Sequence, residues 1–455
     1  MFSLILHGTR SRFAVTLFRN ASCFSSAADV SFRAGRKEQT FTVSYLVDSL
    51  GFTKKHAESI SRKVSFDGKG KNPDSVLNLF KAHGFTDSQI STIVTAYPEL
   101  LLLDAEKSLG PKLRFLHSRG ASSYELAEII SRVPKILGKK GDKTLSLYYD
   151  FVKDVIEADK SSEFEIEKSR HSWPEGNNNK QSNKFRNVLV LRGLGMPQKL
   201  LFPLLISDYQ PVYGKEKFES SLKKVVDKGF DPTTSRFVQA LHVVYQTSDE
   251  TIEAKVDVFK SLGFSVGDVW EIFKKWPFSL KFSEKKINQT FETLKRCGLL
   301  EEEVLSVLKK FPQLIRLSEQ NIANSVETFV GLGFSRDEVT LMIKRFPQCL
   351  NLSAETVKKK TEFLVKKMSL PLKAVVSNPQ VLGYNMEKRT VPRCNVIKTL
   401  MAKGLIGSEL PSMSFVLAIN DQAFLNKYVR KLDNKKLVAE LMAIFTRVCK
   451  AHLED

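Results

Sequence analysis

The sequence has few of the residues and motifs from which catalytic and metal centres are built. Its five cysteines stand at positions 23, 297, 349, 394 and 449, and no two have the C-x-x-C spacing of a metal or redox site. The seven histidines form no H-E-x-x-H motif, and the chain has no glycine-rich phosphate loop and no G-x-S-x-G. These absences predict a protein that is not an enzyme, needs no metal or cofactor, and keeps its cysteines as buried free thiols.

Acidic residues are absent from positions 1–28, where Arg10, Arg12 and Arg19 stand among serines and apolar residues. This composition is typical of an organellar transit peptide. Arginines placed between apolar residues favour mitochondria over plastids, so we expect a mitochondrial matrix protein, with the plastid as the alternative. No apolar run approaches the roughly 18 residues of a membrane-spanning helix, so membrane insertion is not expected.

Basic residues are in excess over the whole chain. Lysine and arginine number 70 against 50 aspartates and glutamates, which gives a formal net charge of +20. A surplus of this size favours a polyanionic partner, either nucleic acid or an anionic membrane surface. Charge alone leaves a basic but inert scaffold as the alternative.

Residues 329–363 contain one complete structural unit. Gly333 can adopt the left-handed conformation that closes a helix, and Ser335 with Glu338 forms an S-x-x-E capping box for the next one. That helix carries an apolar face made of Val339, Met342, Ile343 and Phe346. Pro347 disfavours the helical conformation in the residue before it, so we expect the helix to end at Phe346, with the aromatic ring in the core.

The unit recurs about every 35 residues. The glycine that closes a helix is found at Gly229, Gly263, Gly298 and Gly333. The aromatic-proline pair is found at Tyr97-Pro98, Trp276-Pro277, Phe311-Pro312 and Phe346-Pro347. Self-similarity at this period predicts an all-α fold without a sheet, a curved solenoid of about ten stacked helical repeats.

The repeats and the composition together divide the chain into five segments. We expect a transit peptide at 1–28, N-terminal repeats at 40–158, a degenerate repeat or loop insertion at 159–187, C-terminal repeats at 188–432 and a helical tail at 433–455. The charged and asparagine-rich composition of 159–187 also fits a linker. Trp173-Pro174 keeps the repeat spacing there, which favours the degenerate repeat.

Basic pairs precede the aromatic-proline pair in the three clearest repeats. We call these six residues the basic ladder: Lys274, Lys275, Lys309, Lys310, Lys344 and Arg345. The apolar residues before each pair face the core, so the pairs are predicted to point outward and to form a row. Such a row could neutralise the regularly spaced phosphates of a nucleic-acid duplex. Alternatively, cations near a helix C-terminus complement the macrodipole, which contributes about 0.3–1 kcal/mol each.

Several motifs resemble the plant branch of the mitochondrial transcription termination factor (mTERF) family. They are the repeated L-G-F-S-x-x-E-V and F-P, the run E-K-R-T-V-P-R at 387–393 and F-L-N-K-Y-V at 424–429. The resemblance covers about residues 40–430 and departs from the family pattern at 159–187 and near Tyr245, where the proline is missing. It implies three-helix repeats in a curved solenoid with a positively charged concave path for duplex nucleic acid. Lys373, Lys388, Arg389 and Arg393 are candidates to extend the basic ladder.

The function that the resemblance implies is nucleic-acid binding without catalysis. We expect double-stranded DNA as the ligand and control of mitochondrial gene expression by transcription termination or related transcriptional control. The alternatives are an organellar factor that binds structured RNA for intron splicing or RNA processing, and a helical-repeat interaction scaffold. Pentatricopeptide proteins share the period but not the F-P and S-x-x-E pattern. We expect a monomer, with the organellar transcription or splicing machinery as candidate protein partners.

Overall fold

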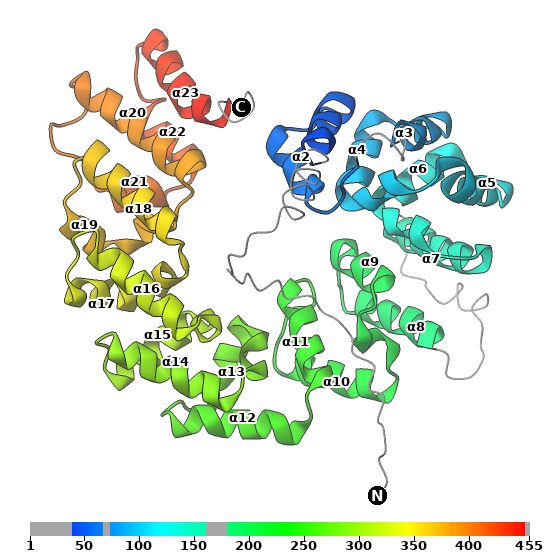
Figure 1. Ribbon diagram of the computed structural model, residues 1–455, viewed down its shortest axis with the longest axis horizontal. Helices are drawn as coiled ribbons and strands as arrows, with labels where there is room; N and C mark the ends of the chain where they lie inside the picture. The colour runs from blue at the N-terminus through cyan, green and yellow to red at the C-terminus, as the bar shows by residue number, and fades with distance from the viewer. Residues whose placement is uncertain (1–38, 67–72, 161–179, 451–455) are drawn as a thin grey trace, which may run out of the picture. The chain divides into compact units, whose positions relative to one another are not determined.

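The structure, a computed structural model, describes residues 39–66, 73–160 and 180–450. Every regular element in these ranges is helical (Figure 1). The α-helices are joined by short 3₁₀ and π turns, which are named η. The predicted all-α repeat fold is therefore confirmed. In the described part of the chain, none of the helices has the length and hydrophobicity that crossing a bilayer requires.

The chain forms two compact units, residues 1–145 and residues 146–455. The first unit opens with a helix over residues 39–50. Its further elements are α2 (Lys54–Ser61), α3 (Pro73–Ala82), α4 (Asp87–Ala96), η1 (Pro98–Leu102), η2 (Ala105–Leu109), α5 (Gly110–Ser118), α6 (Ser123–Arg132) and η3 (Pro134–Gly138). Helix α7 (Asp142–Lys160) begins in the first unit and continues into the second.

The second unit holds the remaining elements. Its first half contains α8 (Lys180–Gly193), α9 (Gln198–Ile206), η5 (Gln210–Tyr213), α10 (Glu216–Asp227), α11 (Ser235–Gln246), α12 (Asp249–Ser261), α13 (Val266–Lys275), η6 (Pro277–Lys281), α14 (Glu284–Arg296), α15 (Glu301–Lys310) and η7 (Pro312–Arg316). Its second half contains α16 (Glu319–Val330), α17 (Arg336–Arg345), η8 (Pro347–Asn351), α18 (Ala354–Glu362), η9 (Phe363–Lys367), α19 (Leu372–Ser377), η10 (Pro379–Gly383), η11 (Met386–Thr390), α20 (Val391–Ala402), α21 (Met413–Ala418), α22 (Asp421–Tyr428) and α23 (Lys435–Lys450).

Helix α17 shows why the repeat folds as it does. Gly333 precedes it with φ +97°, a conformation that only glycine adopts without strain. The Ser335 hydroxyl accepts the N–H of Glu338 at 3.1 Å, and the Glu338 carboxylate accepts the N–H of Ser335 at 2.9 Å, which completes the predicted capping box. The last helical hydrogen bond runs from the N–H of Phe346 to Met342, and Pro347 then opens η8. The predicted helix start and end are both confirmed.

Successive repeats stack in three layers between residues 249 and 383. One layer consists of α12, α14, α16 and α18, and each helix contacts the next along the chain. The second layer consists of α13, α15, α17 and α19, and the third of the short turns η6, η7, η8 and η10. The expected third helix of each repeat is therefore a single 3₁₀ turn. Every repeat buries its apolar face against its two neighbours, as solenoid repeats do.

The aromatic ring of the aromatic-proline pair does not lie in the core, contrary to the prediction. Trp276, Phe311 and Phe346 are half-buried, whereas the prolines that follow them are buried. The aromatic residue is the C-cap of its helix, so its ring turns sideways toward the next repeat. A Cβ atom added to Gly383 would lie 2.8 Å from Cζ of Phe346, which shows how closely this ring covers the end of η10.

Some predicted segments and thiols lie outside the described residues. These are the transit peptide at 1–28, most of the segment 159–187, and the side chains of Cys23 and Cys449. The other three cysteines are free thiols; Cys349 and Cys394 are buried as predicted, and Cys297 is only partly buried. Burial raises the pKa of the Cys349 thiol to about 12, so it stays protonated near neutral pH.

Candidate nucleic-acid interface

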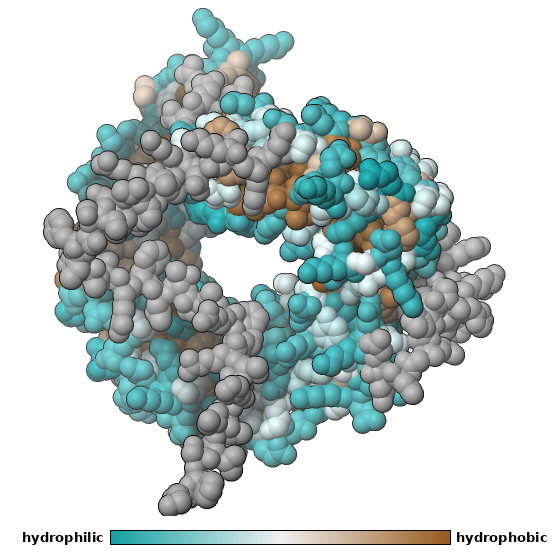
Figure 2. Space-filling model, turned by 45° about the vertical axis from the view of Figure 1, so that its right-hand side comes forward, coloured by the Kyte–Doolittle hydropathy of each residue, from teal (hydrophilic) through white to brown (hydrophobic). Residues whose placement is uncertain are grey.

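The basic ladder lies at the C-terminal ends of α13, α15 and α17 in the second unit. In each pair the first residue is half-buried, and the second residue, which is Lys275, Lys310 or Arg345, is exposed. Hydrophilic residues make up most of the coloured surface on the face shown in Figure 2, and apolar residues are confined to patches between them. The ladder residues are thus on the surface, but their side chains also have partners within the fold.

The first residue of a ladder pair reaches back to an acid of the preceding repeat. Lys309 Nζ lies 3.0 Å from Asp268, the third residue of α13, and Lys344 Nζ lies 2.7 Å from Glu303, the third residue of α15. The hydrogen bond from the lysine is the largest of the effects that lower the pKa of each carboxyl group. These lysines therefore bridge successive repeats through one repeated geometry.

Lys274 is the exception in this row. The preceding helix in its layer is α11, and its third residue is Phe237. Lys274 therefore has no carboxylate at the position that Asp268 and Glu303 occupy for Lys309 and Lys344. Lys274 Nζ instead pairs with Glu271 of its own helix at 3.2 Å.

The second residue of a ladder pair reaches forward to a helix end in the next repeat. Lys275 Nζ donates a hydrogen bond to the carbonyl of Lys309 at 2.7 Å, and Lys310 Nζ donates to the carbonyl of Lys344 at 3.0 Å. Arg345 Nη1 donates to the carbonyl of Val376, in the last turn of α19, at 3.0 Å. Carbonyls at a helix C-terminus carry partial negative charge. The second residue of each ladder pair therefore complements the dipole of a helix in the following repeat, and not that of its own helix.

The residues proposed to extend the ladder fall into two groups. Lys373 and Lys388 are exposed, and within the described ranges their ammonium groups have no hydrogen-bond or ion-pair partner. Arg389 is partly buried and donates to the carbonyl of Leu417 at 3.0 Å.

Arg393 does not extend the exposed ladder, because its side chain is 0% exposed. It donates to the carbonyls of Val416 at 2.7 Å and Ile419 at 2.6 Å and pairs with Asp421. The π turn η11 lies just before it and adds one residue to the helical turn. Arg393 lies in α20 and packs inward, so the prediction that it extends the exposed ladder was wrong at this position.

Sequence reasoning missed a second basic row. Lys281 and Arg316 are the last residues of η6 and η7, and Lys215 has the matching position after the Gln210-Pro211 pair. All three are exposed, and η6 contacts η7 directly. Lys281 donates to the side chain of Gln246. The signal was present in the sequence, since each of these residues stands five positions after the residue that precedes proline.

The helical-repeat architecture agrees with comparisons to known proteins. The mTERF family model matches residues 77–425, which is most of the chain. The chain therefore belongs to the mTERF family, a non-enzymatic family of nucleic-acid-binding regulators of organellar gene expression. A segment of 72 residues is 35% identical to the protein named transcription termination factor MTERF15, mitochondrial, of Arabidopsis thaliana. That segment is 16% of this chain and 16% of the Arabidopsis protein, so the match spans a small part of either.

Proposed function

We propose that this protein binds double-stranded DNA in the mitochondrial matrix through the basic surface of its second unit, and that it controls transcription there by termination or a related step. The observation that carries the proposal is the recurrence of exposed cations at fixed repeat positions. Lys275, Lys310 and Arg345 form one such row, and Lys281 and Arg316 of two adjacent repeats form a shorter one. Rows of this kind match a polymer whose phosphates are themselves regularly spaced.

The hydrogen bonds that the ladder makes within the protein are compatible with this role. An ammonium group has three donors, and Lys275 and Lys310 each use one on a carbonyl of the next repeat. The remaining donors are available to phosphate oxygens. The carbonyl contact also holds the long side chain in place, which reduces the conformational entropy lost on binding.

The proposal is tested by duplex affinity measured across a salt series. Changing Lys275, Lys310 and Arg345 together to Gln should lower the slope of log K against log salt by about 2–3, near 0.9 for each lost phosphate contact. The same three positions changed to Glu should weaken binding further. Binding should fall equally for unrelated sequences, because phosphate contacts position a protein without reading bases.

A matched control removes three cations elsewhere on the second unit. Lys199, Lys223 and Lys431 are exposed, and their change to Gln lowers the net charge by the same amount. If this control lowers the slope as much as the ladder variant does, binding depends on overall charge and the ladder is not the interface. Helical content, followed by circular dichroism, must be unchanged in both variants.

Structured RNA remains the second candidate ligand, because the basic rows offer phosphate contacts and no base contacts that would separate DNA from RNA. The same salt series with an RNA duplex decides between them. A tenfold or larger preference for the RNA duplex, about 1.4 kcal/mol, would move the proposal to splicing or RNA processing. Weak, salt-insensitive binding to both duplexes would instead favour a protein-interaction scaffold.

A further inference from the structure

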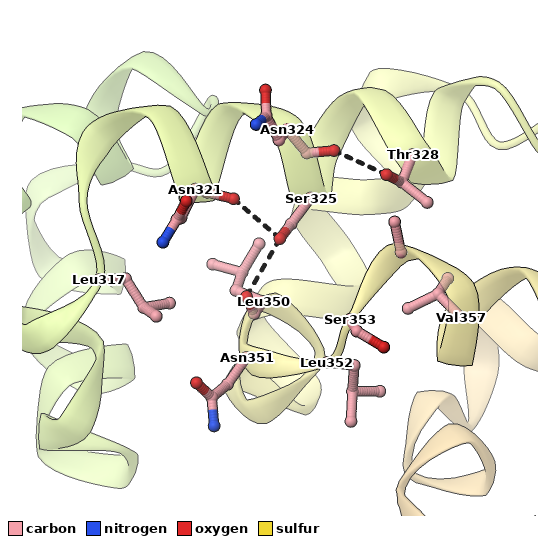
Figure 3. Close-up of a pocket in the computed structure, with 11 residues that line it drawn as sticks. Leu317, Asn321, Asn324, Ser325, Thr328, Leu350, Asn351, Leu352, Ser353 and Val357 are labelled. Carbon is pink, nitrogen blue, oxygen red and sulfur yellow. Dashed lines mark hydrogen bonds between the residues drawn. The ribbon is translucent and has the colours of Figure 1, made fainter. Parts of the chain in front are cut away.

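A polar pocket lies between α16 and the segment formed by η8 and the start of α18 (Figure 3). Its volume is about 330 Å³. The polar residues that line it are Asn321, Asn324, Ser325, Thr328, Asn351 and Ser353. The lining contains no charged side chain, although the chain as a whole is strongly basic.

The equivalent space in the neighbouring repeats is occupied by a lysine of the chain itself. Lys286 in α14 extends to the next repeat and donates to the carbonyl of Leu317. Lys360 in α18 does the same and donates to the carbonyl of Leu382 at 2.7 Å. In the first unit, Lys112 of α5 donates to the carbonyl of Leu137. A lysine ammonium group on a turn carbonyl, buried at Lys360 and partly buried at Lys112 and Lys286, is thus a recurring feature of this fold.

Helix α16 lacks both of these lysines. Lys286 stands three positions after the N-cap Ser283, and the matching residue after the N-cap Ser318 is Asn321. Lys360 stands seven positions after its N-cap, and the matching residue in α16 is Ser325. Both replacements are short. Ser325 Oγ still reaches the carbonyl of Leu350 at 3.1 Å, but no side chain of α16 fills the space that a lysine would take.

The pocket is therefore rich in hydrogen-bond acceptors without a cation to satisfy them. Among the described residues, the side-chain amides of Asn321 and Asn351 make no hydrogen bond, and Figure 3 draws none to either amide. The carbonyl of Leu352, which corresponds to the Leu317 carbonyl that accepts Lys286, likewise accepts no hydrogen bond in the described part of the chain. Asn321 and Asn351 are exposed and Leu352 is partly buried, so this pocket is open to water. In the neighbouring repeats, where a lysine fills the position, burial lowers the pKa of Lys286 and Lys360.

We propose that this pocket binds a primary alkylammonium group supplied from outside the chain. The carbonyls of Leu350 and Leu352 and the amide oxygens of Asn321 and Asn351 provide acceptors for the three N–H donors of such a group. The volume accommodates an ammonium group with a four-carbon stem, which is what Lys360 places in the equivalent position. Anions are disfavoured, because no cationic side chain lines the pocket to hold them.

Two sources can supply this chemistry, a free polyamine and a lysine side chain of a partner protein. The experiment titrates the full chain, without nucleic acid, with spermidine and with N-acetyl-lysine methylamide in an isothermal calorimeter. Binding of spermidine alone supports the polyamine as the source, and binding of the lysine derivative supports a partner's lysine. Binding of neither compound overturns the proposal.

The variant Asn321→Lys tests whether the ligand binds in this pocket. The new ammonium group should occupy the pocket as Lys286 occupies its own position, so ligand affinity should fall about tenfold or more. Ala323→Lys is the matched control, since it adds the same charge to the same helix at an exposed residue outside the pocket lining. Its affinity should stay within about threefold of the unmodified chain, a shift expected from a single exposed charge.

Asn321→Lys should also raise the melting temperature above that of Ala323→Lys, because it adds an inter-repeat hydrogen bond to the carbonyl of Leu352. If Asn321→Lys does not fold, Ser325→Lys serves the same purpose at the position equivalent to Lys360. An equal loss of affinity in the lysine variant and the control, or no loss in either, would place the ligand elsewhere and overturn the proposal. Because no duplex is present, this result is independent of the proposed DNA binding.

Discussion

Lys344 and Glu303 join two successive repeats through one carboxylate that has two tasks. Glu303 accepts the N–H of Leu300 at 3.0 Å and so caps its own helix, and it also accepts Lys344 Nζ of the next repeat at 2.7 Å. Asp268 combines the same two tasks one repeat earlier, with Ser265 and Lys309. Helix capping and repeat stacking are therefore coupled at these positions.

Stability should depend on pH through Glu303. Its pKa is lowered in the folded protein, chiefly by the hydrogen bond from Lys344. A carboxyl group whose folded pKa is depressed stabilises the fold above its unfolded pKa, and this contribution is lost as the pH falls through the folded pKa. The variant Glu303→Gln should melt below the unmodified chain at pH 7, and the difference should shrink as the pH falls into the acid range. A difference that does not change with pH would exclude the ionic contribution.

Gly383→Ala should destabilise the protein because of a close contact across a repeat boundary. The new Cβ would lie 2.8 Å from Cζ of Phe346, so we expect a loss of about 1–3 kcal/mol, as for other overpacked sites. Phe346→Ala alone should cost about 1–3 kcal/mol, less than a fully buried phenylalanine, because the ring is half-buried. In the double variant the two losses should not add, which urea unfolding of all four proteins measures. Strict additivity would show that the ring does not cover Gly383.

Two glycine-to-alanine changes should have opposite effects. Gly333 has φ +97°, so Gly333→Ala should cost about 1–2 kcal/mol. Gly267 lies inside α13 without positive φ, and a Cβ there meets nothing closer than Ser265 Oγ at 3.7 Å. Gly267→Ala should therefore stabilise the protein by about 0.5–1 kcal/mol. Equal effects in denaturant unfolding would contradict the assignment of Gly333 as the residue that closes its helix.

Residues 1–28 should direct import into mitochondria, because they contain arginines and no acidic residues. A fluorescent protein fused to residues 1–40 is expected to enter mitochondria in plant cells. Replacing Arg10, Arg12 and Arg19 by Gln should keep it in the cytosol. A fusion that enters plastids alone would support the plastid as the compartment. If the fusion with its arginines intact stays in the cytosol, residues 1–28 are not a transit peptide.

The sequence was most informative where a rule acts within a few residues. Capping boxes, closing glycines and the proline that ends each second helix are local, and they placed both ends of α17 correctly. Phe346 was placed wrongly for a different reason. Helical spacing predicts which face of the helix a residue lies on, but Phe346 is the C-cap, where the backbone leaves the helical conformation and the side chain points elsewhere. Arg393 was placed wrongly because positive charge alone does not show whether a side chain faces solvent, and this one binds carbonyls of the next repeat inside the fold.

The partners of the basic ladder could not be predicted for a different reason. A lysine that reaches a carbonyl in the next repeat leaves no trace in the pattern of either repeat alone. Lys275 and Lys310 were correctly expected to be exposed, but the carbonyls that hold them become visible only when the repeats are stacked. The candidate pocket could not be predicted from the sequence either. It exists because Asn321 is too short to fill the space that Lys286 fills in the preceding repeat.

The hydrogen bonds and ion pairs of the basic ladder also affect how the gene can change. Apart from the Lys274–Glu271 pair, which lies within one helix, these contacts join equivalent positions in adjacent repeats, so the removal or addition of one whole repeat preserves them. Removing residues 301–335 would put Lys344 in the place of Lys309. Its side chain could then pair with Asp268, and its carbonyl could accept the hydrogen bond from Lys275. Duplication of the same segment would insert one further copy of both contacts. Unequal recombination can therefore change the number of repeats and still keep the hydrogen bonds and ion pairs between adjacent repeats.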